Sequence, residues 1–180
     1  MLSVYAIEES EIYGHGKRAV IWFSGCTLRC PGCVNHHLWD KSNGQKETAG
    51  SIIDKIMTYN GISGVTLIGG EPLDQDMELL DLIKVIKKRM LDVVLFTGYE
   101  REELQNWQGE VFDLSDVVIC GRYIEGLRDT TLLLRGSSNQ QIIVRNEELK
   151  GFYSQEARQV EIIISDTETV YLGFPEDFIA

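Results

Sequence analysis

Three of the four cysteines lie within eight residues, at Cys26, Cys30 and Cys33. Thiolates at this close spacing on one loop can hold three irons of a cubane iron–sulfur cluster, which normally takes four thiolates. The remaining iron then keeps an open coordination position, and open positions on metals are where small molecules bind and react. The spacing therefore predicts a reactive 4Fe-4S cluster, bound by these three cysteines on a loop over residues 24–40.

Other uses of the cysteines fit this pattern less well. A zinc ribbon needs a second Cys-x-x-Cys or Cys/His pair, and the nearby His36 and His37 keep zinc open as an alternative. A disulfide framework fails because three clustered cysteines cannot pair and Cys120 is distant. A role as small buried hydrophobes conflicts with the polar, turn-forming residues between them. For Cys120 itself, at the end of a predicted strand, burial as a small hydrophobe is the expected role.

The elements that must position this loop are apolar strands that alternate with amphipathic helices. Such alternation implies parallel pairing through right-handed crossovers. We therefore expect an α/β fold: a partial, open parallel βα barrel in one domain over residues 1–180, with a C-terminal β-hairpin inside a β-rich extension from about residue 141. The expected strands are 2–8, 19–23, 64–68, 92–96, 116–119, 141–145, 160–164 and 168–172, and the expected helices are 48–59, 75–90 and 100–107.

Glycine-bearing loops follow four of the predicted strands. Besides the cysteine loop, they are Gly69-Gly70-Glu71-Pro72, Thr97-Gly98-Tyr99 and Gly121-Arg122. In parallel α/β architectures, ligands bind and reactions run at the edge where strands reach their carboxyl ends. Glycines there let the backbone approach a ligand closely. We therefore expect the four loops to share one site.

The cysteine motif also carries a resemblance to a known family. It reads Cys-x-x-x-Cys-x-x-Cys, is followed by Asn35, Trp39 and Asp40, and resembles the radical S-adenosylmethionine superfamily. More narrowly, it is similar to the activating enzymes that install a glycyl radical. The Pro31-Gly32 pair inside the motif, and the stretch Arg-Gly-Ser-Ser-Asn-Gln at 135–140, resemble the branch that activates anaerobic ribonucleotide reductases. The resemblance covers residues 14 to about 144.

The resemblance implies a 4Fe-4S cluster and S-adenosylmethionine as cofactors. It places the methionyl amino group of S-adenosylmethionine on the loop of Gly69, Gly70 and Glu71, with the contact at Gly70. From its chemistry alone, Glu71 can instead hold this loop by accepting backbone hydrogen bonds. The resemblance also implies that the backbone of Gly32, Cys33 and Val34 faces the adenine, and that Asn35, Thr97 and Arg122 make polar contacts to the ribose or carboxylate.

Composition limits the partners. The chain has 180 residues and a net charge of −11, which argues against a nucleic-acid or anionic-membrane surface because phosphates would be repelled. No signal-peptide pattern or membrane span is evident in the sequence, so a cytoplasmic protein is expected. The resemblance implies two partners: a large glycyl radical enzyme, expected to be the anaerobic ribonucleotide reductase, and a flavodoxin- or ferredoxin-type electron donor.

Two alternative functions stay open on the sequence. The substrate can be a different glycyl radical enzyme or a peptide. The chain can also be an iron–sulfur electron carrier in which Cys120 supplies a fourth ligand. A smaller expectation concerns His15, in the glycine-containing turn before the strand at 19–23, which is expected to be a solvated loop histidine.

Overall fold

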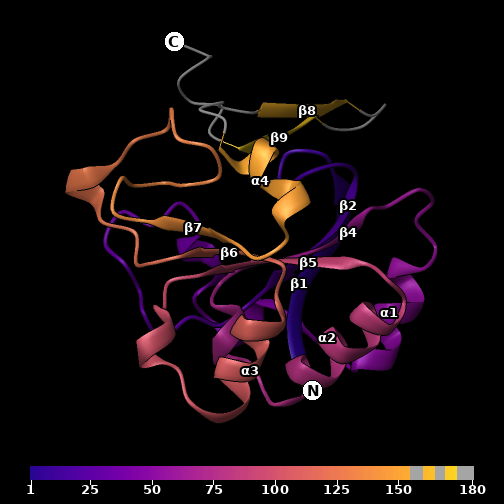
Figure 1. Cartoon of the computed structure of the whole chain (residues 1–180). Coiled ribbons are helices and arrows are strands. Elements are labelled where there is room, and N and C mark those ends of the chain that lie inside the picture. Colours follow the sequence, from indigo (N-terminus) through magenta and orange to yellow (C-terminus); the bar gives the residue numbers. More distant parts are fainter. Residues whose placement is uncertain (155–159, 165–168, 174–180) are drawn as a thin grey trace.

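A computed structural model describes residues 1–154, 160–164 and 169–173 (Figure 1). Its main sheet contains β1 (Leu2–Ser10), β2 (Arg18–Phe23), β3 (Gln45–Glu47), β4 (Gly64–Gly69), β5 (Asp92–Thr97), β6 (Val117–Cys120) and β7 (Gln141–Val144). The strand order is β3-β1-β2-β4-β5-β6-β7. The four strands β2, β4, β5 and β6 pair in parallel, whereas β1, β3 and β7 pair antiparallel to their neighbours. The predicted α/β class is therefore confirmed, with an open and largely parallel sheet, and the predicted partial βα barrel stays a prediction.

The other elements cover the two faces of this sheet. They are α1 (Ala49–Ile56), α2 (Glu78–Lys88), α3 (Asn106–Leu114), α4 (Lys150–Tyr153), β8 (Val160–Ile164) and β9 (Thr169–Gly173). The first three helices lie on one face, and α4 with the antiparallel pair β8 and β9 lies on the other (Figure 1). No helix in the described ranges is long and apolar enough to cross a membrane.

The predicted boundaries of the helix expected at 100–107 were wrong. The helix expected at 100–107 is a 3-10 turn at Arg101–Glu103 followed by α3, which begins only at Asn106. Asn106 has a φ of 52°, and a left-handed residue cannot continue a right-handed helical path. The strand expected at 141–145 is β7, which pairs with β6 at the edge of the main sheet, and the β-rich extension from about residue 141 stays a prediction. The connection between β8 and β9, residues 165–168, lies outside the described residues.

Strand alternation divides the core into two layers, as the period of two requires. On β6, Val118 and Cys120 pack into the layer built with the helices, while Val117 and Ile119 pack into the layer on the opposite face with Tyr153. Cys120 is 4% exposed. Its predicted role as a small buried hydrophobe is confirmed.

A buried ion-pair network joins the amino-terminal ends of the parallel strands. The Arg18 side chain is fully buried, donates to Thr66 Oγ1 at 2.8 Å and to the Val65 carbonyl at 2.9 Å, and pairs with Asp92. The expectation that His15 is a solvated loop histidine was wrong. Its side chain is 15% exposed, and its Nε2 lies 3.0 Å from Asp92 Oδ2. Arg18 and His15 both contact the Asp92 carboxylate, and these two contacts hold the turn that contains His15 against the sheet.

Replacement of Asp92 by alanine should destabilise the fold by about 3–5 kcal/mol, because it leaves the buried Arg18 guanidinium without its counter-charge. The measurement is the free energy of unfolding in denaturant near neutral pH. Asp54, exposed on α1, supplies the matched control, and Asp54→Ala should change stability by less than about 0.5 kcal/mol. Equal losses of stability in the two variants would show that the Arg18–Asp92 ion pair does not stabilise the fold more than an exposed aspartate does.

Candidate active site

A cavity of about 740 Å³ lies at the carboxyl ends of the parallel strands, and Cys26, Cys30 and Cys33 all line it. Its floor is a layer of side chains from the four parallel strands. Sequence analysis missed these residues, although alternation within the predicted strands would have placed them on one face. They are Trp22 on β2, Ile68 on β4, Phe96 on β5 and Ile119 on β6.

Backbone hydrogen bonds hold the two ends of the cluster loop, residues 24–40, together. Gly25 N–H donates to the Leu38 carbonyl at 2.8 Å, and Cys26 N–H donates to the Trp39 carbonyl at 3.0 Å. Glu71 N–H donates to the Gly25 carbonyl at 2.8 Å, so the loop at 69–72 rests directly on the cluster loop. This contact is made through main-chain atoms and needs no bound metal.

Asp74 makes a second connection between the same loops. Its Oδ2 accepts from Thr27 N–H at 2.6 Å and from the Thr27 hydroxyl at 2.8 Å, while its Oδ1 accepts from the Tyr99 hydroxyl at 2.9 Å. Thr27 directly follows Cys26, so this carboxylate fixes the first turn of the cysteine motif. Neither Asp74 nor Tyr99 was singled out from the sequence for this role, because the contact depends on loop geometry.

Backbone and indole N–H groups near the thiols fit sulfur ligands of a cluster, whereas burial of the thiols opposes their deprotonation. Burial raises the pKa of the Cys26 thiol to about 11, although the backbone N–H groups of Arg29 and Leu28 favour its thiolate. Burial also raises the pKa of Cys33, and the Asn35 backbone and the Trp39 indole lower it in part. The Trp39 indole N–H is buried and makes no hydrogen bond within the described residues. It lies near enough to Cys33 to favour the thiolate form of that side chain. N–H groups around cysteine sulfur are a main control on cluster potential.

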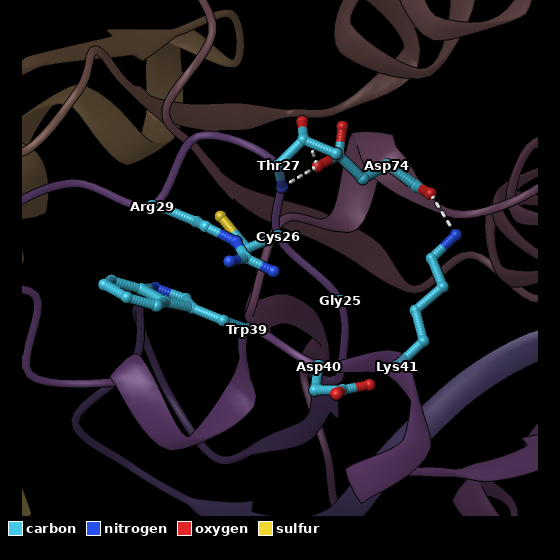
Figure 2. A pocket seen from close by; sticks show the side chains of 8 residues that line it. All are labelled: Gly25, Cys26, Thr27, Arg29, Trp39, Asp40, Lys41 and Asp74. Carbon is cyan, nitrogen blue, oxygen red and sulfur yellow. Dashed lines mark hydrogen bonds between the residues drawn. The ribbon is translucent and has the colours of Figure 1, made fainter.

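A second, smaller pocket of about 520 Å³ also borders the cluster loop (Figure 2). Cys26 is the only cysteine in its lining, and Arg29, Trp39 and Lys41 also contribute. Figure 2 shows the Lys41 ammonium donating to the Asp74 backbone carbonyl, at 2.7 Å. All three cysteines line the larger cavity, and only Cys26 lines the smaller pocket. We therefore assign the candidate cluster site to the larger cavity and call the smaller one the outer pocket.

Glu71 holds the glycine loop in the way that its chemistry predicts. Its carboxylate accepts from Leu73 N–H at 2.9 Å, from the Thr97 hydroxyl at 2.8 Å and from Gly98 N–H at 2.8 Å. The side chain is buried, and burial raises its pKa to about 7 in spite of these three donors. Glu71 therefore joins the loop after β4 to the loop after β5, and the predicted bracing role is confirmed.

All the site residues expected from the sequence line the cavity except Arg122. The lining contains Gly32, Val34, Asn35, Gly69, Gly70, Glu71 and Thr97 together with the three cysteines. Arg122 instead forms a two-point ion pair with Glu103, at 2.7 and 2.8 Å, and lies over the Tyr99 ring. The Thr97 hydroxyl is already engaged with Glu71.

Of the residues behind the alternative metal sites, His37 lines the same cavity as the three cysteines, whereas Cys120 does not. His36 Nδ1 is 3.3 Å from the Cys33 carbonyl, and the His37 ring meets the Tyr5 ring edge-on. Cys120 belongs to the core layer on the helical face, whereas its neighbour Ile119 lines the cavity. In the described part of the chain, no three His, Cys, Asp or Glu side chains converge as ligands of a single metal ion do. A cubane makes a different demand, since each thiolate bonds to a separate iron.

Comparison with known proteins identifies the class first. A family model described as "4Fe-4S single cluster domain" matches residues 12–143. The matched range includes the cluster loop and strands β2 to β7, apart from the last residue of β7. The fold and the three-thiol cavity thus belong to an iron–sulfur cluster domain. QueE from Escherichia coli is a structural neighbour with a TM-score of 0.47 and 17% sequence identity, covering 64% of this chain and 68% of that one.

Sequence relatives then give the particular family. The anaerobic ribonucleoside-triphosphate reductase-activating protein of Escherichia coli is 33% identical over 138 residues, which cover 72% of this chain and 89% of the relative. The proteins of that name from Salmonella typhimurium and Enterobacteria phage T4 are 36% and 35% identical, covering 72% and 73% of this chain and 89% and 86% of theirs. The chain therefore belongs to the family of anaerobic ribonucleoside-triphosphate reductase-activating proteins, within the radical S-adenosylmethionine enzymes.

Proposed function

We propose that this protein activates an anaerobic ribonucleoside-triphosphate reductase by generating a glycyl radical on it. One observation carries the proposal: the three thiols of the cysteine motif and the glycine loop at 69–72 line the same cavity, in a chain whose relatives are named for this activation. In the proposal, Cys26, Cys30 and Cys33 bind a 4Fe-4S cluster and leave one iron open for S-adenosylmethionine.

Cys26, Cys30 and Cys33 would hold the cluster, which would supply the electron for reductive cleavage of S-adenosylmethionine and so for removal of a hydrogen atom from a glycine Cα of the partner. The protein's own residues bind and orient. Gly69 and Gly70 let the strand-end backbone approach the methionyl group, and Glu71 keeps that loop in place. The apolar floor under the cavity excludes water, which protects a reactive intermediate from side reactions.

The remaining cofactor contacts are part of the same proposal. Gly32, Cys33 and Val34 present backbone to the adenine, and Asn35 and Thr97 contribute polar groups. Arg122 takes a different role from the one expected, because its guanidinium is held by Glu103. It shapes the loop after β6 and leaves the cofactor to other residues.

We place electron entry at the outer pocket. Cys26 lines both this pocket and the cavity, whereas Arg29 and Lys41 line the outer pocket alone. The cavity must receive S-adenosylmethionine and the partner, so the outer pocket gives a flavodoxin- or ferredoxin-type donor a separate approach to Cys26.

The larger architecture completes the proposal. The open sheet serves as the partial βα barrel of radical S-adenosylmethionine enzymes, within a single domain over residues 1–180. Strands β8 and β9 form its C-terminal hairpin. The cytoplasmic location expected from the sequence stays a prediction.

The proposal is tested with anaerobically reconstituted, reduced protein. Incubation with S-adenosylmethionine should release 5′-deoxyadenosine and methionine, and addition of the reductase should produce a glycyl radical doublet in electron paramagnetic resonance. A purified protein that contains zinc in place of iron, or a reduced cluster that releases no 5′-deoxyadenosine, would end the proposal. Release of 5′-deoxyadenosine with no radical on the reductase would point to another glycyl radical enzyme as the partner.

A further inference from the structure

The stretch at residues 135–140 is joined by hydrogen bonds to the segment at 121–129. The Gln140 side chain makes the central contacts. Its Oε1 accepts from Gly136 N–H at 2.8 Å and from Ser137 N–H at 3.2 Å, and its Nε2 donates to the Gly121 carbonyl at 2.9 Å. One carboxamide therefore shapes its own turn and holds the first residue of the other segment.

Further contacts follow along the segment. Asn139 Nδ2 donates to the Arg122 carbonyl at 2.8 Å, and Ser138 N–H donates to the Leu127 carbonyl at 2.8 Å. Ile124 N–H donates to the Ser137 hydroxyl at 3.2 Å. The segment contains only a short 3-10 turn at Glu125–Leu127, so it has little hydrogen bonding of its own. Its path depends on the stretch at 135–140.

The held segment forms one wall of the cavity. Tyr123 and Arg128 line the cavity, and the Glu125 side chain packs against Gly32 in the cluster loop, where an added Cβ would meet the carboxyl carbon at 2.7 Å. Ile124 and Leu127 are 45% and 44% exposed. The wall therefore touches the cluster loop and also presents two apolar side chains to solvent.

We propose that Gln140 is a positioning residue that fixes the segment at 121–129 as the wall against which the partner enzyme's glycine-bearing loop is held. The inference rests on the proposed function and deepens it. The cluster loop and the loops at 69–72 and 97–99 provide the expected cofactor contacts. The wall follows the end of β6, borders the same cavity and touches the cluster loop where Glu125 packs against Gly32. Ile124 and Leu127 are exposed next in sequence to Tyr123 and Arg128, which line the cavity. The buried core of a protein–protein interface is enriched in apolar residues, so a protein loop suits this wall as its occupant.

The test compares Gln140→Ala with Gln141→Ala. Gln141 is the next residue, exposed on β7, and no side-chain hydrogen bond ties it to the wall. Two quantities are measured: the glycyl radical formed on the reductase per 5′-deoxyadenosine released, and the hydrogen exchange of amides in 121–129. For Gln140→Ala, the radical yield should fall on the order of tenfold or more, because small misplacement of reacting atoms costs that much, and exchange in the segment should accelerate. Gln141→Ala should match the parent protein in both.

Asn139→Ala is a milder second variant that removes only the bond to the Arg122 carbonyl, and it should shift both quantities in the same direction. Gln140→Glu keeps the two accepted bonds and loses the donated one, so it should also loosen the segment. An unchanged radical yield in Gln140→Ala and Asn139→Ala would overturn the inference, as would a loss of S-adenosylmethionine affinity that accounts for the whole defect. A parent protein that releases no 5′-deoxyadenosine overturns the proposed function instead, and the exchange measurement still reports on the wall.

Discussion

Replacement of any one of Cys26, Cys30 and Cys33 by alanine should abolish the cluster. Two thiolates remain in each variant, so one more iron loses its protein ligand. Even changes beyond the direct ligands of a metal site typically cost 10–100-fold in affinity, so loss of a ligand should lower cluster retention by more than about a hundredfold. Iron and sulfide content after anaerobic reconstitution, together with the visible absorption of the cluster, measure the effect. Release of 5′-deoxyadenosine should fall below detection.

Cys120→Ala is the matched control, since it removes the fourth thiol of the chain. Cys120 packs in the helical core layer, on the sheet face away from the cavity. The variant should keep the iron content of the parent protein and lose only about 1 kcal/mol of stability, as an ordinary core truncation does. A colourless Cys120→Ala protein would instead support the electron-carrier alternative, with this thiol as a fourth ligand.

The shared edge of the sheet could be predicted from sequence because it follows from strand direction alone. Cys26, Gly70 and Thr97 each come just after an apolar run, and parallel pairing brings the ends of such runs together. The floor of the cavity follows from the same pattern, one step further. Trp22 and Phe96 lie within the predicted strands, and their shared face could have been derived from the period of two.

Other features depend on contacts between segments distant in sequence. Arg122 follows a strand end just as Thr97 does, and only the structure shows that its charge is taken by Glu103. His15 occupies a polar, glycine-containing turn, and its burial results from Asp92, which lies 77 residues away. The hydrogen bonds of the Gln140 side chain could not be derived from the sequence either. A polar stretch between strands has the same composition whether it is exposed or packed.

Gly70→Ala should have the second-largest effect, because the glycine loop and the cluster loop meet there without side chains. A Cβ on Gly70 would lie 2.5 Å from the Gly25 carbonyl oxygen and 2.9 Å from the Leu38 carbonyl oxygen. Both are backbone atoms held by their own hydrogen bonds, so the loops must separate. Overpacking of this kind costs about 1–3 kcal/mol of stability, and a displacement near 1 Å should lower S-adenosylmethionine cleavage on the order of a hundredfold.

Gly50→Ala separates this steric effect from the general effect of replacing a glycine. Gly50 lies in α1, where the new Cβ would meet only Thr48 Oγ1, at 3.7 Å. Alanine is favoured over glycine inside helices by up to about 1 kcal/mol, so this variant should be as stable as the parent protein or more stable. Unfolding in denaturant and equilibrium binding of S-adenosylmethionine are measured for both. If Gly70→Ala bound S-adenosylmethionine as tightly as Gly50→Ala does, close backbone contact at 69–72 would not be what holds the methionyl group.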